Sequence, residues 1–181
     1  MILRQAIRLL NLSGFCLTSL LALGINLAQA KESDYKEPVT IDSGNQLVEL
    51  ADNKVTFTDN VIVKQGTLDV RASKLVVTRN DQGLQTMTAY GSPATYYQVL
   101  DSGQPVNAKA KQITYDIKTR TITLLDNAEL KQNDNIVTGY RIRYFIDKEQ
   151  MEAEGQGNNG RVKTIFLPEQ LQNMNNKEAK P

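Results

Sequence analysis

The sequence predicts an all-β domain built from many short strands, arranged as a sandwich, a jelly roll or a barrel. β-Branched and aromatic residues alternate with polar residues over most of the chain, the period expected of strands with one buried face. Turn-forming Asn, Asp and Gly residues interrupt these runs about every ten residues. Apart from a weak turn near Glu169, no window has convincing helical spacing.

The first thirty residues have the features of a cleaved signal peptide. Arg4 and Arg8 form a basic start, and the mostly apolar residues 14–25 are too few to cross a bilayer as a helix. The small residues of Ala28-Gln29-Ala30 then form a cleavage site. We expect cleavage after Ala30 and export from the cytoplasm, and the alternative is an uncleaved membrane anchor.

Composition excludes several kinds of site in the mature chain. Cys16, the only cysteine, lies inside the signal segment, and Phe15 before it argues against lipid attachment. The chain has no His, so a Ser-His-Asp triad and a His-ligated metal site are both excluded. Charges balance at 21 Lys and Arg against 20 Asp and Glu, so no basic excess points to nucleic acid. No cofactor is expected.

The expected strands follow one another with short connections. Their alternating apolar residues are Val55 and Phe57, Val61 and Val63, Leu68 and Val70, Ile113, Tyr115 and Ile117, and Ile142, Tyr144 and Ile146. The expected turns fall at residues 52–53, 59–60, 65–66, 81–83, 91–93, 102–103, 126–127, 133–135 and 155–160. In the run PATYYQVL, alternation places one tyrosine inward, on the face of Ala94 and Gln98.

The chain also repeats itself, which predicts stacked hairpin units. Residues 55–65 (VTFTDNVIVKQ) align with residues 122–132 (ITLLDNAELKQ) at an offset of 67. A half-repeat begins with a small residue at Ala72, Ala110 and Gly139, and a degraded copy begins at Ser43. A unit of two strands cannot bury its apolar face alone, so copies must stack, and the stack ends in open strand edges. These edges are either blocked or used for head-to-tail pairing.

Catalysis would have to rest on carboxylates. The aspartates lie in the expected turns, where turn formation explains them, and residues 133–135 lack calcium-loop spacing. Two other function classes stay open from these residues. One is a β-sandwich enzyme acting on glycans, and the other is a structural subunit that polymerises without cargo.

Three segments together resemble a known family. Residues 55–79 (VTFTDNVIVKQGTLDVRASKLVVTR), 89–98 (AYGSPATYYQ) and 163–172 (KTIFLPEQLQ) resemble the OstA-like family of periplasmic lipopolysaccharide-transport proteins. The resemblance runs from about Pro38 to Gln172. It implies an open, twisted antiparallel β-jelly roll of about sixteen short strands. We expect residues 31–168 to form the OstA-like domain, and residues 169–181, which are rich in Asn, Gln and Lys, to form a disordered tail.

The resemblance also implies a function, which is that of a non-enzymatic carrier of lipopolysaccharide contributing to outer-membrane assembly. Lipid A acyl chains would lie in an apolar groove. One end of the sheet would meet a membrane-anchored partner, LptC, and the other the amino-terminal domain of the outer-membrane translocon LptD. The resemblance implies groove contacts at Val39, Ile41, Tyr96, Ile113, Tyr115 and Ile117. Arg79 is a candidate phosphate contact, although a solvated strand-end arginine is an equal alternative.

Overall fold

The computed structural model describes residues 34–80, 83–157 and 159–166. The expected signal peptide, residues 1–30, and the expected tail, residues 169–181, lie outside the described residues. Within the described ranges, no helix has the length and apolar character needed to cross a membrane.

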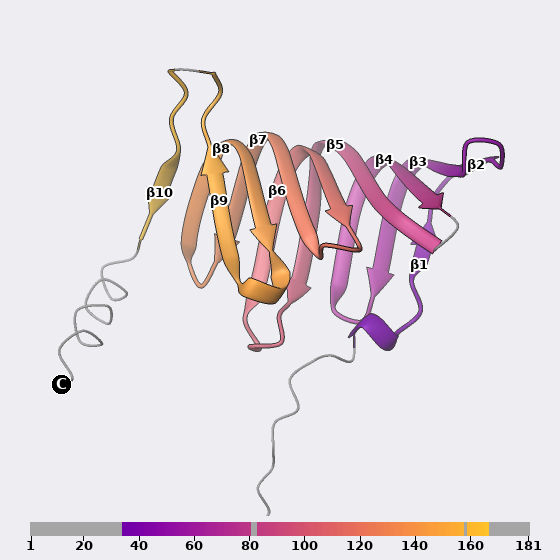
Figure 1. The fold of residues 1–181 in the computed structure, drawn as a ribbon, viewed down its shortest axis with the longest axis horizontal. Coiled ribbons are helices and arrows are strands. Elements are labelled where there is room, and N and C mark those ends of the chain that lie inside the picture. Colours follow the sequence, from indigo (N-terminus) through magenta and orange to yellow (C-terminus); the bar gives the residue numbers. More distant parts are fainter. Residues whose placement is uncertain (1–33, 81–82, 158, 167–181) are drawn as a thin grey trace, which may run out of the picture.

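The described residues form almost nothing but antiparallel β-strands, which confirms the predicted fold class (Figure 1). Two short 3-10 turns, η1 (Asp34–Lys36) and η2 (Ile146–Lys148), accompany them. The ten strands are β1 (Thr40–Asp42), β2 (Asn45–Glu49), β3 (Lys54–Gln65), β4 (Leu68–Asn80), β5 (Gly83–Val99), β6 (Pro105–Asp116), β7 (Thr121–Gln132), β8 (Asn135–Phe145), β9 (Gln150–Glu154) and β10 (Lys163–Ile165).

All ten strands belong to one open sheet. Its order is β1-β3-β4-β5-β6-β7-β8-β10, while β2 pairs with β3 and β9 pairs with β8. Consecutive long strands are therefore neighbours, as the stacked hairpin units predicted. The N-terminal and C-terminal strands lie at opposite ends of the longest axis (Figure 1).

The six long strands, β3 to β8, bend partway along their length. The pairing register shifts between Thr58 and Val61 in β3, and at a corresponding level in each following pair of long strands. A register shift of this kind is a β-bulge, which bends the strand and increases its twist. The bends fold the single sheet into two layers that face each other.

Three expected turns are wrong, because residues 59–60, 91–93 and 126–127 lie inside β3, β5 and β7. Asp59 and Asn60 have φ angles of 68° and 53°, and Asp126 and Asn127 have 63° and 54°. Asn and Asp tolerate positive φ in a bulge as readily as in a hairpin, so the pattern does not distinguish the two. The described sheet accordingly has ten strands rather than about sixteen. When the two halves of each of the six long strands are counted separately, the sheet has the expected sixteen strands.

The small residues of the half-repeat lie at these bends. Ala110 is fully buried there, and a Cβ atom on Gly139 would lie 2.9 Å from the carbonyl oxygen of Glu154. Larger side chains would separate the backbones where the layers meet. The repeated small residue is therefore a requirement of the fold.

The first layer holds β1, β10 and the half of each long strand that lies on the same side of the bends as these two strands. The second layer holds the other halves together with β2 and β9. The buried core between the layers includes Val61, Val63, Ala94, Tyr96, Val106 and Leu130 from the first layer and Leu75, Ala89, Ile113, Ile122, Leu124, Ile142 and Tyr144 from the second. The layers are joined along the margin of bends, and the hairpin turns lie along the opposite margin (Figure 1).

Candidate functional site

A narrow apolar pocket lies between the two layers near the margin of turns, and we call it the central pocket. Val63, Leu68 and Tyr96 line it from the first layer, and Leu75, Ile113 and Tyr115 from the second. The space open to a water-sized sphere is only about 30 Å³. The described state therefore has room for no more than about one or two water molecules.

Three of the six expected groove residues, Tyr96, Ile113 and Tyr115, come together in this pocket. Tyr96 lies on β5 and the other two on β6, in strand halves that belong to opposite layers. The alternation predicted for residues 94–98 is confirmed, because Tyr96 is 6% exposed while Tyr97 is 37% exposed. The sequence pattern thus identified an inner face that the fold brings together across two layers.

The hydroxyl of Tyr96 needs a partner in this apolar surrounding, and Gln98 provides it. The hydroxyl donates to Gln98 Oε1, and both side chains are buried. A buried polar group without a partner would destabilise the fold, so this pair makes a tyrosine compatible with the interior.

The other three expected groove residues lie outside the central pocket. Ile41 on β1 is half-buried, packs against the core and pairs with Val63. Val39 precedes β1 and is exposed. Ile117 follows β6, is half-buried, and donates its backbone N–H to the carbonyl oxygen of Gln85 over 3.0 Å. Arg79 is exposed near the end of β4, in the second layer at the margin of turns.

A second and wider pocket opens between the layers at the C-terminal end of the sheet, and we call it the C-terminal pocket. Leu130 and Val137 line it from the first layer, Met151 and Ala153 from β9, and Phe166 from the end of the described chain. The space open to a water-sized sphere is about 490 Å³. Sequence reasoning missed this site, although the alternation of Met151 and Ala153 with polar neighbours carried a short strand signal.

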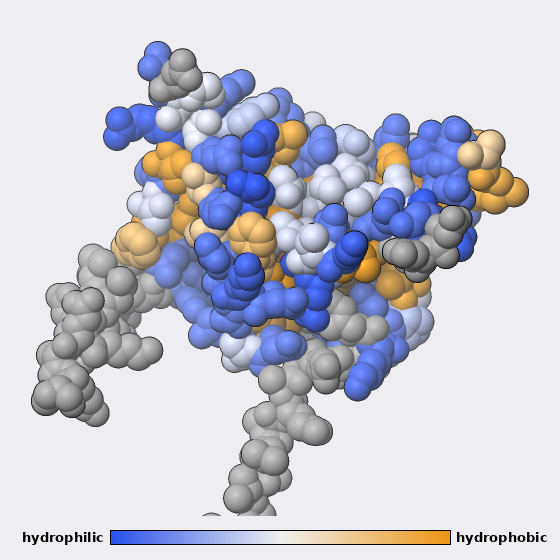
Figure 2. All heavy atoms as spheres, in the orientation of Figure 1, coloured by the Kyte–Doolittle hydropathy of each residue, from blue (hydrophilic) through white to orange (hydrophobic). Residues whose placement is uncertain are grey.

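Charged side chains lie on the outer faces of both layers, where they form cross-strand ion pairs. Lys109 Nζ lies 2.9 Å from Glu129 Oε1 on the first layer, and Arg143 lies 2.8 Å from Glu152 Oε2 on the second. Exposed pairs of this kind add little stability, and they keep the outside hydrophilic while the inside stays apolar. Apolar and charged residues mix over the visible face of the molecule (Figure 2).

Tyr144 is a titrating group of the interior whose pKa is strongly shifted. Burial raises its pKa to about 12, the charge of Glu149 adds to the shift, and Gln132 opposes it. The phenol is therefore protonated at neutral pH. Among the described residues, no group of three His, Cys, Asp or Glu side chains is placed to hold a metal ion.

Comparisons with known proteins agree with this architecture. The family model described as "LptA/(LptD N-terminal domain) LPS transport protein" matches residues 40–150. The lipopolysaccharide export system protein LptA of Escherichia coli is 40% identical over 174 residues, covering 95% of this chain and 93% of the relative. LptA of Haemophilus influenzae is 40% identical over 155 residues, covering 84% and 90%.

A solved structure has the same fold. It is the crystal structure of LptH from Pseudomonas aeruginosa, described as the LptA homologous periplasmic component of the conserved lipopolysaccharide transport device. It superposes with a TM-score of 0.68 at 20% identity, covering 75% of this chain and 99% of that one. With the sequence relatives and the matched model, the two-layered open sheet assigns the chain to a family: it belongs to the LptA/LptD N-terminal domain family of lipopolysaccharide-transport proteins.

Proposed function

We propose that this chain is a periplasmic carrier that holds the acyl chains of lipopolysaccharide between the two layers of its sheet. The observation that carries the proposal is the apolar interior lined from both layers, with the central pocket at the margin of turns. Membership of a lipopolysaccharide-transport family supports the choice of lipid.

Shielding acyl chains from water is the physical task of such a carrier. Each exposed CH₂ group costs about 0.8 kcal/mol, so a chain of about a dozen carbons costs on the order of 10 kcal/mol in water. An interior that is open along one margin receives the chains while the sugars stay in solvent.

The central pocket is too narrow for an acyl chain in the described state, so loading requires the layers to move apart. The bends join the layers along one margin, and the opposite margin consists of separate hairpin turns. We expect opening at the margin of turns, with Tyr96, Ile113 and Tyr115 contacting the lipid first. Ile41 and Val39 extend this surface toward the N-terminal end, and Ile117 and Arg79 are proposed contacts near the turns, Arg79 with a phosphate.

The ends of the sheet suit pairing with proteins of the same fold. At one end β1 and β2 flank β3, and at the other β9 and β10 flank β8, so each layer ends in a short edge strand. Unpaired edges accept a further strand. We propose head-to-tail self-association, pairing with LptC at one end and pairing with the amino-terminal domain of LptD at the other. The proposed role involves no catalysis, and export includes removal of residues 1–30.

Mass spectrometry of lipid extracted from the natively purified protein tests this function. We expect lipopolysaccharide in the extract, and saturable binding when it is added to the delipidated protein. Protein that carries none and binds none, yet still polymerises, would instead support a structural subunit without cargo.

A further inference from the structure

The connection between β9 and β10 contains the dipeptide Asn159-Gly160, which is the one place in the chain where glycine follows asparagine. The connection lies at the C-terminal end of the sheet and projects past the margin of bends, away from the hairpin turns (Figure 1). Both residues are exposed and belong to no strand. The proposed carrier function therefore gives this dipeptide no role.

An asparagine that precedes glycine reacts readily with its own backbone. The backbone nitrogen of the following residue attacks the side-chain amide carbon and closes a ring. A side chain on that residue hinders the closure, whereas glycine has none and reaches the required conformation easily. No backbone carbonyl among the described residues accepts a hydrogen bond from the N–H of Gly160, so hydroxide from the solvent has access to it.

The same loop is closed by direct backbone packing. Gly155 and Gly160 lie on its two sides, close to each other. A Cβ atom on Gly155 would overlap the backbone of Gly160, and one on Gly160 would overlap the backbone nitrogen of Gln156. The two sides of the loop therefore have no room for an extra backbone atom at this crossing.

The strand that follows the loop, β10, has few contacts of its own. It pairs with β8 over three residues, Lys163 to Ile165, and all three are exposed. Just before it, the Val162 side chain approaches Gly139 at the bend of β8. So short a pairing is marginal by itself. The position of β10 thus depends on the loop that returns the chain to β8.

We propose that Asn159-Gly160 is a site of spontaneous deamidation, and that the isoaspartate formed there releases β10 from the sheet. The Gly160 nitrogen gives its proton to hydroxide and bonds to Cγ of Asn159. The bond from Cγ to the side-chain nitrogen breaks, and this nitrogen takes a proton from water and leaves as ammonia. Water then opens the ring at the main-chain carbonyl, which becomes a free carboxylate.

The chain then runs through the former side chain of residue 159, so its backbone is one carbon longer. The crossing of Gly155 and Gly160 does not accommodate this lengthening, and β10 loses its register with β8. Its release leaves β8 as the edge of the first layer at the C-terminal end, with unpaired backbone groups that accept another strand.

Peptide mass mapping of the mature chain, stored at neutral and at mildly alkaline pH, tests the site. The peptide that contains Asn159 should show the mass change of an amide converted to an acid, and sooner at alkaline pH because hydroxide drives the attack. The product should be labelled by an isoaspartate methyltransferase. Asn53, which is also exposed but precedes Lys54, is the internal control. An unmodified Asn159, or equal modification of Asn53, would overturn the proposal.

Amide hydrogen exchange of the stored protein tests the effect on β10. We expect lost protection in β10 and unchanged protection where β3 pairs with β4. Asn159→Asp, measured fresh, adds the charge without lengthening the backbone, and Asn159→Gln, measured after storage, resists ring closure. Both variants should keep β10 protected. Protection that survives isoaspartate formation, or that is lost in either variant, would overturn the release of β10.

Discussion

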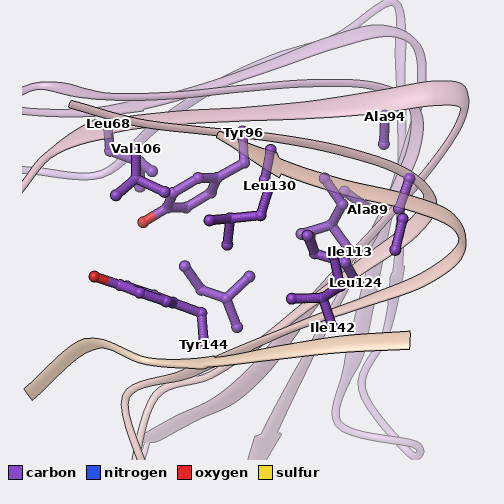
Figure 3. Packing of buried hydrophobic residues seen from close by; sticks show 14 of the residues in the cluster. Leu68, Ala89, Ala94, Tyr96, Val106, Ile113, Leu124, Leu130, Ile142 and Tyr144 are labelled. Atoms are coloured by element: carbon purple, nitrogen blue, oxygen red, sulfur yellow. The ribbon is translucent and has the colours of Figure 1, made fainter. Parts of the chain in front are cut away.

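Tyr96 and Tyr144 approach each other from opposite layers with their hydroxyls directed to the same side of the core (Figure 3). The Tyr96 hydroxyl donates to Gln98, and the Tyr144 hydroxyl lies buried beside the side chain of Gln132. The first is a satisfied polar group in a closed interior. The second stays protonated at neutral pH, because burial raises its pKa to about 12.

Two isoleucines, one on β6 and one just after it, should respond differently to substitution by aspartate. Ile113 is 3% exposed in the core, so Ile113→Asp should destabilise the domain by about 3–5 kcal/mol and unfold most of it. Ile117 is half-buried beyond the end of the strand, so Ile117→Asp should stay folded and lose lipid capture. Circular dichroism with thermal melting measures the first effect. Unfolding by both variants would mean that Ile117 belongs to the closed core.

The N-terminal turn η1 should add measurable stability through Asp34. Asp34 is 5% exposed, and its carboxylate accepts hydrogen bonds from the backbone N–H of Thr67, over 3.0 Å, and from the Thr67 hydroxyl. Asp34→Ala leaves these donors unpaired and should lower the free energy of unfolding by about 1–3 kcal/mol in urea titrations. Asp42→Ala, at an exposed position on β1, is the control, and equal effects would contradict this role.

Gly66, in the turn between β3 and β4 that contacts Asp34, should not tolerate substitution. Its φ of 55° is unfavourable for residues with a side chain, and an added Cβ would lie 2.2 Å from Asp34 Oδ1. The sequence marked residues 65–66 as a turn, but it could not reveal Asp34. The contact between Asp34 and Thr67 joins residues 33 positions apart and follows from the folded arrangement alone.

A pH-dependent contribution to stability is expected from Asp116. The backbone N–H of Thr119 donates to its Oδ1 over 2.8 Å, and this bond holds the pKa of Asp116 below its ordinary value. The contribution is therefore present above the pKa of the unfolded chain and is lost as pH falls through the lower, folded pKa. Asp116→Asn should cost about 0.5–1 kcal/mol at neutral pH and nothing in acid well below the folded pKa. Urea titrations at both pH values measure it, and a loss that is independent of pH would contradict the assignment.

Self-association should rise with concentration and depend on the edge strands. Val48 on β2 is 49% exposed at the N-terminal edge, so Val48→Lys should leave the fold intact and weaken association about five- to tenfold. Tyr97→Lys, in the middle of the sheet, is the control. Light scattering over a wide concentration range measures both. A strict monomer or a closed dimer of the unmodified protein would contradict head-to-tail pairing.

The period of two in the sequence predicted the strands and their inner faces correctly, because one buried face imposes that period directly on the residues. Val61, Val63, Ile113 and Tyr144 are buried as alternation requires. The pattern did not reveal that residues 59–60 and 126–127 bend strands, since bulges and hairpins use the same residue types. The sequence pattern also could not distinguish the central pocket from the closed core, because both have the same types of apolar residue on the inner face.

The most direct test of the carrier account is photo-crosslinking from the two faces of neighbouring strands. A photo-crosslinking amino acid replaces Tyr96 or Tyr115, which line the central pocket, and in matched variants Tyr97 or Thr114, which occupy the alternate positions. Lipopolysaccharide captured in intact cells is detected on immunoblots. The account predicts capture from Tyr96 and Tyr115 and little or none from Tyr97 and Thr114. Equal capture from both faces would contradict a lipid held between the layers.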